Sequence, residues 1–181
     1  MRITRETVIP EEEVEVFRKI YRDAFAALEE LSPLRQSMTD EEFYVEMTNP
    51  SVVKIVGWDD HGNPAAILCS TNDIGCIPWL SPAYYARVYP EQFSARSLFW
   101  VGTILVHPDR RGEHFVGELI QENVRLVNEY DSNGVCLFDC CQYNADEMGL
   151  AEIVASFANK VFPVDCQQID AQYFYAIRRV N

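Results

Sequence analysis

Two adjacent arginines mark the stretch of this sequence whose residue types point most directly to chemistry, VGTILVHPDRRGEHFVGELIQENVRLV, from Val101 to Val127. It reads as an apolar strand, a break at Pro108, the pair Arg110 and Arg111, and then a helix. A helix start presents unpaired backbone N–H groups and roughly half a positive charge, and guanidinium groups pair well with phosphate. The pattern therefore predicts an anion site at the helix start. Two solvated charges in a turn are the alternative.

The composition of the chain limits the partners of such a site. The 181 residues include 28 acidic and 15 basic ones, and the formal net charge is −13. Because nucleic acids bind to basic surfaces, a nucleic-acid partner is disfavoured, and an amine partner is mildly favoured. No apolar run is long enough to cross a bilayer, so no membrane partner is expected. The first residues lack an apolar signal core, which predicts a cytoplasmic protein.

The cysteines do not have the spacing of a metal site. None of the six lies in a CxxC pair of the kind that zinc sites use. Cys140 and Cys141 are adjacent, so on a strand their side chains would point to opposite faces. We expect reduced thiols, mostly in the core, and no metal.

Hydrophobic periodicity predicts a fold of the α/β (α+β) class with one mixed central sheet. Strands are expected over residues 1–8, 51–58, 65–71, 97–107 and 135–142, with one or two more after residue 162; helices are expected over 11–31, 39–47, 112–130 and 145–159. The apolar strands on either side of the helix at 112–130 should be parallel. We therefore predict a single domain over residues 1–181, with six to seven strands flanked by about four helices.

The segment at 72–97 interrupts this order. It is rich in proline and tyrosine and has no clear period, so we interpret it as a long excursion with one short helix. Long loops are often functional, and Trp79, Tyr84 and Tyr85 would offer a substrate an apolar wall with polar tips. We predict that these three contact the substrate; the alternative is that they only pack the excursion onto the sheet.

The stretch with the two arginines resembles the acyl-CoA-binding motif of the GNAT N-acyltransferase superfamily. In that family a strand ending V-x-P leads into R/Q-x-x-G-x-G/A at the start of a helix. Here Val106, Pro108, Arg111 and Gly112 stand in register with that motif. The expected order of strands and helices is also similar to the family along nearly the whole chain.

The sequence departs from the family motif at two glycines, which fall on His114 and Val116. Glycine at such positions allows the backbone to approach a pyrophosphate closely. The His114 side chain would either crowd the phosphates or contact them itself. Gly117, one residue later, would compensate in part.

The resemblance implies an acyltransferase that moves an acetyl or longer acyl group from CoA to the amine of a small-molecule acceptor. Acetyl-CoA or another acyl-CoA would be the co-substrate. The alternatives are an acyl carrier protein as donor, and a catalytically silent protein of the same fold that binds CoA or a metabolite; a homodimer also stays open. The residues that the resemblance assigns to the donor are Leu105, Val106, His107, Arg110, Arg111, Gly112, Glu113, His114, Phe115, Val116, Gly117 and Asn144.

The usual acid and base of the family are missing from their places in this sequence. The base is often a carboxylate on the strand before the motif, at a position that falls here near Gly102 or Thr103. The acid is often a tyrosine early in the helix after the next strand, and the helix expected at 145–159 has none. As replacements we predict Tyr143 as the acid and Asp139 as the base or amine anchor. A surface tyrosine and a buried, paired carboxylate are the alternatives.

Overall fold

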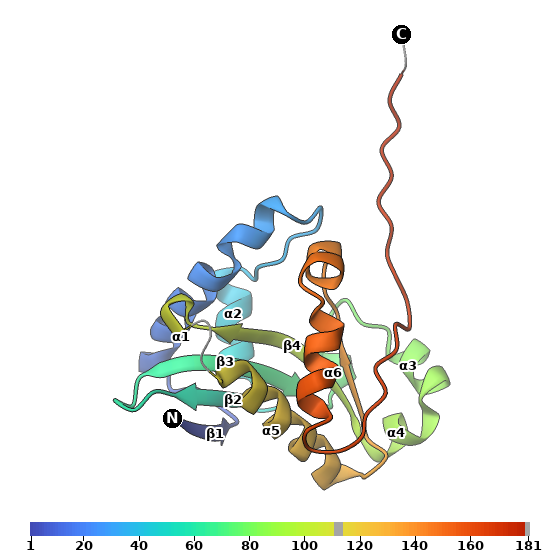
Figure 1. The fold of residues 1–181 in the computed structure, drawn as a ribbon. Helices are drawn as coiled ribbons and strands as arrows, with labels where there is room; N and C mark the ends of the chain where they lie inside the picture. Colours follow the sequence, from blue (N-terminus) through green and yellow to red (C-terminus); the bar gives the residue numbers. More distant parts are fainter. Residues whose placement is uncertain (111–113, 180–181) are drawn as a thin grey trace.

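The computed structural model describes residues 1–110 and 114–179, with a five-stranded mixed sheet at the centre (Figure 1). The strands are β1 (Arg2–Glu6), β2 (Val53–Trp58), β3 (Pro64–Thr71), β4 (Leu98–Val106) and β5 (Val135–Phe138). They lie in the order β1-β2-β3-β4-β5, and neighbours are antiparallel except for β4 and β5, which are parallel. The mixed sheet, the β2–β3 hairpin and the parallel β4–β5 pair confirm the predicted fold class.

Helices and single helical turns connect these strands. The α-helices are α1 (Glu11–Phe25), α2 (Asp40–Thr48), α3 (Pro82–Val88), α4 (Pro90–Ala95), α5 (Phe115–Tyr130) and α6 (Leu150–Ala158). The 3₁₀ turns are η1 (Ala26–Glu30), η2 (Ile74–Cys76) and η3 (Pro108–Arg110), and η4 (Tyr143–Glu147) is a π-helical turn. At the start of α2, Thr39 and Glu42 form a reciprocal capping box.

The strand count of six to seven is wrong, because the described part of the tail after residue 162 forms no strand. Its side chains are exposed, to 73% at Tyr173 and 102% at Ile177, and Figure 1 shows the tail leaving the body of the molecule. The spacing of Tyr173, Tyr175 and Ile177 at every second residue indicates a local preference for extended backbone. A strand also needs a neighbour that pairs with its N–H and C=O groups, and the described residues of the tail pair with no strand of the sheet.

The excursion at 72–97 contains more helix than predicted. It forms η2, α3 and α4, and each of the two α-helices begins with a proline in its first turn, Pro82 or Pro90, where the missing N–H costs nothing. The hydroxyl of Ser81 accepts a hydrogen bond from the N–H of Tyr84 and so caps α3. Tyr85 is buried in a cluster with Ile74 and with residues of β4 and β5.

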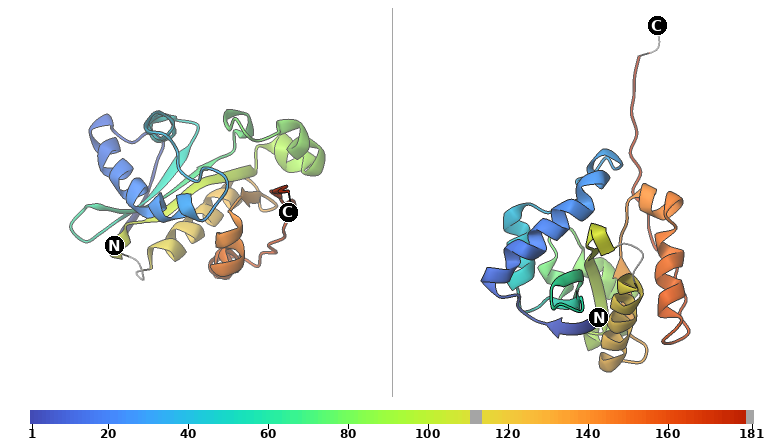
Figure 2. Two further views of the ribbon diagram at one scale, coloured as in Figure 1. Left: turned by 90° about the horizontal axis from the view of Figure 1, so that it is seen from above. Right: turned by 60° about the vertical axis from the view of Figure 1, so that its left-hand side comes forward.

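The helices cover the two faces of the sheet (Figure 2). Helices α1 and α2 bury Phe17 and Phe43 against one face, while α5 buries Phe115 and Leu119 against the other. Helix α6 packs on α5. The amphipathic helices α1 and α5 have apolar stripes that must be covered, so the sheet forms the middle layer.

Glycines allow α5 to lie close to its neighbours. A Cβ atom on Gly57 of β2 would lie 2.6 Å from the ring of Phe115, and one on Gly117 would lie 2.5 Å from the ring of Phe157 in α6. The first contact holds the start of α5 against the sheet, close to the end of β4. The second sets the distance between α5 and α6.

Candidate active site

The strands β4 and β5 part halfway along β4. Their pairing runs from Leu98 and Val135 to Val101 and Phe138, whereas β4 continues to Val106. Among the described residues, the second half of β4 therefore pairs with β3 alone. Because parallel strands point the same way, their separated ends open on the side from which α5 starts.

A bulge at Gly102 lies where the strands part. Ser70 of β3 opposes Val101 and Cys69 opposes Thr103, so Gly102 is one residue extra. Beyond the bulge the N–H of His107 donates to the carbonyl of Ala65 at 2.7 Å.

Backbone directions alternate along a strand, and this decides which groups of β4 face the opening. Counting back from His107, the backbone groups of Thr103 and Leu105 also face β3. Those of Ile104 and Val106 then face the side that β5 has left. Of the three β4-end residues assigned to the donor, Val106 therefore presents its backbone to the opening, and Ile104 was missed.

The loop after β4 is tied to the β2–β3 turn. In η3 the Nη2 atom of Arg110 donates to Oδ2 of Asp59 at 2.9 Å, and the Asp59 side chain is 8% exposed. The predicted donor residues Arg111, Gly112 and Glu113 lie outside the described residues. His114 is exposed at the N-cap of α5, and Phe115 and Gly117 are buried behind it. The structure thus places a guanidinium beside the end of β4, partly neutralised by a carboxylate.

The predicted catalytic residues follow β5. Asp139 comes directly after the last paired residue, Phe138, so it lies level with the bulge across the opening, and it is exposed. Tyr143 and Asn144 are half-buried in η4, and π-helical turns are rare and frequently occur at functional sites. The chain therefore brings all three to the end of the sheet where the strands part.

The aromatic residues of the excursion divide into two kinds. Tyr85 is 8% exposed and packs against Trp100 and Leu137, as the packing alternative expects. Burial is the main cause that raises the pKa of Tyr85, and the charge of Asp139 contributes less. Trp79 is 63% exposed, and the half-buried Tyr84 packs against the same cluster. Of the three residues predicted to contact the substrate, Trp79 is therefore the one whose side chain is mainly exposed.

Comparison with known proteins identifies the architecture. No protein-family model matches the sequence, and no curated protein matches it. A ribosomal-protein-alanine N-acetyltransferase from Brucella melitensis biovar Abortus 2308 superposes with a TM-score of 0.57 at 16% identity over 100% of both chains. An aminoglycoside acetyltransferase from an uncultured soil metagenomic sample, in complex with sisomicin, superposes with a TM-score of 0.55 at 16% identity over 98% of this chain and 96% of that chain. This chain has the GNAT fold.

A third structure with the GNAT fold carries an analogue of both substrates. It is AAC(6′)-Iy in complex with the bisubstrate analogue CoA-S-monomethyl-acetylneamine, with a TM-score of 0.54 at 11% identity over 98% of this chain and 99% of that one. At such identities the likeness concerns the fold, so the chemistry of this chain has to be argued from its own residues.

Glu46 of α2 lies at the bulge and is not among the residues predicted from the sequence. A Cβ atom on Gly102 would lie 3.9 Å from Oε2 of Glu46 and 3.7 Å from Nε1 of Trp100. Burial raises the pKa of Glu46, and the Cys69 thiol, the Thr103 hydroxyl and the Lys54 ammonium act in the opposite direction. A carboxylate from α2 therefore lies next to Gly102, close to the position at which the GNAT resemblance implies a carboxylate on the strand.

The sequence did contain a signal for Glu46. Phe43 and Met47 are the buried residues of α2, and Glu46 shares their side of the helix at a spacing of three. A carboxylate on the inner side of an amphipathic helix is costly to bury, which makes it a candidate for a role. The group that the Glu46 side chain faces is set by the position of β4, which the spacing of residues within α2 does not predict.

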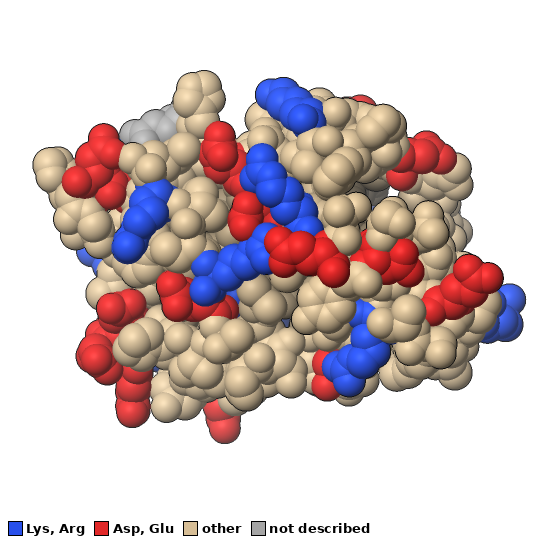
Figure 3. All heavy atoms as spheres, turned by 90° about the horizontal axis from the view of Figure 1, so that it is seen from below, with Lys and Arg blue, Asp and Glu red and all other residues tan. Residues whose placement is uncertain are grey.

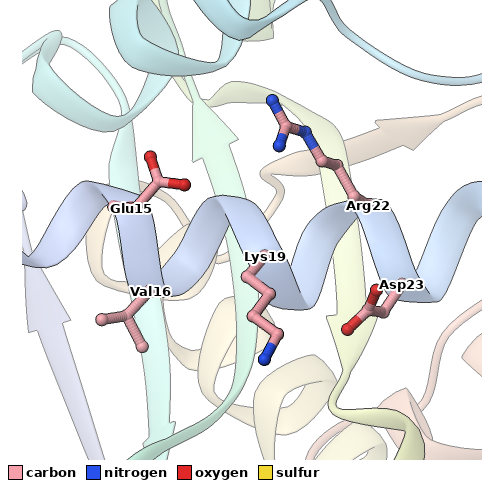
Figure 4. A pocket seen from close by; sticks show the side chains of 5 residues that line it. All are labelled: Glu15, Val16, Lys19, Arg22 and Asp23. Carbon is pink, nitrogen blue, oxygen red and sulfur yellow. The ribbon is translucent and has the colours of Figure 1, made fainter.

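A surface hollow of about 500 Å³ lies elsewhere, along α1 (Figure 4). Its lining is Glu15, Val16, Lys19, Arg22 and Asp23. All five side chains come from one helix and only one is apolar, whereas ligand sites are enclosed and mostly apolar. We therefore assign no ligand to this hollow.

Neither the surface charge nor the possible metal ligands of the described residues indicate a further binding site. Figure 3 shows lysines and arginines interspersed with acidic residues on one face of the molecule. Within residues 1–110 and 114–179, no group of three or more His, Cys, Asp or Glu side chains could hold a metal ion. No helix of that same part is long and apolar enough to span a membrane.

Proposed function

We propose that this protein transfers an acyl group, acetyl in the simplest case, from CoA to the amine of a small-molecule acceptor. One observation carries the proposal: β4 parts from β5 at a bulge and continues to Val106 paired, among the described residues, with β3 alone, so that its other side faces the opening. The free backbone groups of Ile104 and Val106 can bind an extended amide-containing arm as they would bind another strand. The N–H groups at the start of α5 then suit the phosphates at the far end of such an arm.

Acyl transfer to an amine requires three contributions from a protein. The reactants must be held in line, negative charge on the thioester oxygen must meet an N–H donor, and the amine must lose a proton. The free side of β4 supplies backbone donors, and the exposed Asp139 offers a cationic acceptor an opposite charge at the opening. The sisomicin complex of a structure with the same fold supports a small polyamine-like acceptor.

A thermal melt with and without acetyl-CoA tests the donor site, with free CoA and ATP as controls. A ligand at a hundred times its dissociation constant stabilises the folded state by about 2.7 kcal/mol. For a chain of this size that corresponds to a rise in melting temperature of roughly 5–10 °C. We expect this rise with both forms of CoA and none with ATP. No rise with either form would contradict a free-CoA enzyme and would direct the search to an acylated carrier protein.

The same thermal melt of two arginine variants tests whether Arg111 binds the phosphates of CoA. Arg111→Ala should reduce the shift with acetyl-CoA, since a charge-assisted hydrogen bond is worth about 1.5–3 kcal/mol. Arg178→Ala removes an exposed arginine from the tail and should leave the shift unchanged. Equal shifts in the two variants would show that the phosphates bind elsewhere.

A further inference from the structure

Two buried polar atoms at the bulge in β4 have no hydrogen-bond partner in the described part of the chain. They are Oε1 of Glu46 and Nε1 of Trp100, one an acceptor and the other a donor. Buried polar atoms are nearly always paired, so each exception calls for an explanation. Oε2 of Glu46 and Nε1 of Trp100 both lie within 4 Å of the Cβ position on Gly102. Gly102 itself is exposed, so a ligand at the surface can reach this point.

The other titratable groups around Glu46 are unsuited to accept a proton. Lys54 of β2 donates from Nζ to the backbone carbonyls of Thr7, Asn49 and Val52 at 2.7–2.9 Å, so its three protons are in use. Cys69 of β3 is fully buried, and burial raises the pKa of its thiol well above the usual value.

Besides burial, the charge of Glu46 also contributes to the raised pKa values of Tyr21 of α1 and Cys76 of η2. Burial is the main cause that raises the pKa of Tyr21 to about 12, and it likewise raises the pKa of the Cys76 thiol. Both groups therefore stay protonated at neutral pH. Of the titratable groups that act on Glu46, none can take up a proton at neutral pH, whereas the carboxylate of Glu46 can. Asp139 is a second carboxylate level with the bulge, and it lies across the opening, after β5.

We propose that Glu46 is the general base of the acyl transfer and that it acts from α2 at the position of Gly102, where β4 carries no side chain. The inference rests on the proposed function and assigns a residue to its proton transfer. The amine nitrogen attacks the thioester carbon, a C–N bond forms, and the C–S bond breaks with its electron pair leaving on sulfur. Glu46 takes the proton that the nitrogen loses. That proton then passes through solvent to the thiolate, so CoA leaves as the thiol and the carboxylate is restored.

The surroundings of Glu46 suit this role. A base works best when its pKa lies close to the working pH, and burial moves Glu46 in that direction. The glycine at position 102 leaves space beside Oε2 for the nitrogen of an acceptor. The unpaired N–H of Trp100 can donate to an oxygen of the acceptor or of a bridging water, which fixes the acceptor next to the carboxylate.

Steady-state kinetics of four proteins test the assignment: the wild type, Glu46→Gln, Glu46→Asp and the control Glu41→Gln. Glu41 is an exposed residue of the same helix. The donor is acetyl-CoA, and the acceptors are an aminoglycoside, a polyamine and an amino-acid amide. The reaction is followed by loss of thioester absorbance, because the six cysteines of the chain would react with a thiol reagent.

We expect Glu46→Gln to lower kcat by about 100-fold or more, as removal of a general base does, and to abolish the rise of kcat with pH. The melting shift with acetyl-CoA and the KM for acetyl-CoA should stay as in the wild type. Glu46→Asp should retain part of the activity, and Glu41→Gln all of it. If Glu46→Gln does not melt cooperatively, the test uses Glu46→Asp instead. We then expect kcat of Glu46→Asp to be at least tenfold lower than that of the wild type.

The remaining outcomes separate the two proposals. A Glu46→Gln variant within threefold of the wild-type kcat would overturn the role of Glu46 and leave the acyltransferase intact. A wild type that shows the melting shift but acetylates none of the amines would overturn the transfer reaction and the base assignment with it. A wild type without the shift would overturn the free-CoA site itself.

Discussion

The carboxylate of Glu46 links stability to pH at the scale of one residue. Burial raises the pKa of Glu46 above the ordinary value of 4.5, so the folded chain holds this proton more tightly than the unfolded chain does. Between those two pKa values the native state binds more protons, and the free energy of unfolding falls as pH rises. The contribution of Glu46 to stability is therefore fully present below pH 4.5 and is lost as pH rises through the raised pKa.

Glu46→Gln removes this ionisation while keeping the size of the side chain. We expect the variant to gain stability relative to the wild type as pH rises from about 4.5, and the difference to level off above the raised pKa. Urea unfolding of both proteins at several pH values between 4.5 and 8 measures the difference, with Glu41→Gln as control. A difference that does not change with pH would show that Glu46 titrates normally. Such stabilisation with loss of activity is common where a site requires a buried charge.

At the scale of elements, the contact between α5 and α6 depends on the absence of a side chain at Gly117. The ring of Phe157 lies where a Cβ atom would be. The same helix start carries the predicted phosphate site, and its position relative to β4 is held from the other side by Phe115 packing on Gly57. Gly117 was predicted to contact the donor; the structure gives it a packing role as well.

Gly117→Ala should therefore destabilise the protein although alanine favours helix. Overpacking costs about 1–3 kcal/mol and outweighs a helix-propensity gain of about 1 kcal/mol at most. At Gly75 an added Cβ atom would meet nothing closer than 3.5 Å, so Gly75→Ala should change the free energy of unfolding by less than about 0.5 kcal/mol. Urea denaturation of both variants provides the measurement. Combining Gly117→Ala with Phe157→Leu should restore part of the loss, and no recovery would contradict the proposed clash.

At the scale of the whole molecule, the tail contributes little to the packed body. The residues at 171–179 are exposed and form no helix or strand. Lack of burial means that removing such a segment costs little free energy. Whatever the tail does, it therefore acts outside the cores on the two faces of the sheet.

Removing the residues at 171–181 should leave the melting temperature within about 2 °C of the full chain, which corresponds to about 0.5 kcal/mol or less for a chain of this length. A melt of the two forms at equal concentration tests this. A fall of more than about 5 °C would show that the tail packs in solution, and sedimentation of both forms would then tell whether it packs on a second copy.

Several parts of the fold could be predicted because their causes lie within short stretches. The Thr39–Glu42 capping box, the hairpin around the turn at 59–63 and the helix after Pro108 follow from capping, turn chemistry and periodicity. The tail was predicted wrongly for the complementary reason. Alternation is a local property, whereas a strand requires pairing with a distant segment.

The sequence by itself determined the order of elements, the parallel βαβ unit and the resemblance at Arg111, since these depend on neighbouring residues and regular spacing. Only the tertiary structure decided that β4 parts from β5 after Val101, that Gly102 is a bulge, and that Glu46 lies beside it. Register and burial are set by contacts between segments that lie far apart in the sequence, such as Ser70 with Val101 and Glu46 with Gly102. The sequence therefore predicted a donor site after β4, and the fold brought to the bulge a carboxylate, Glu46, that no motif contained.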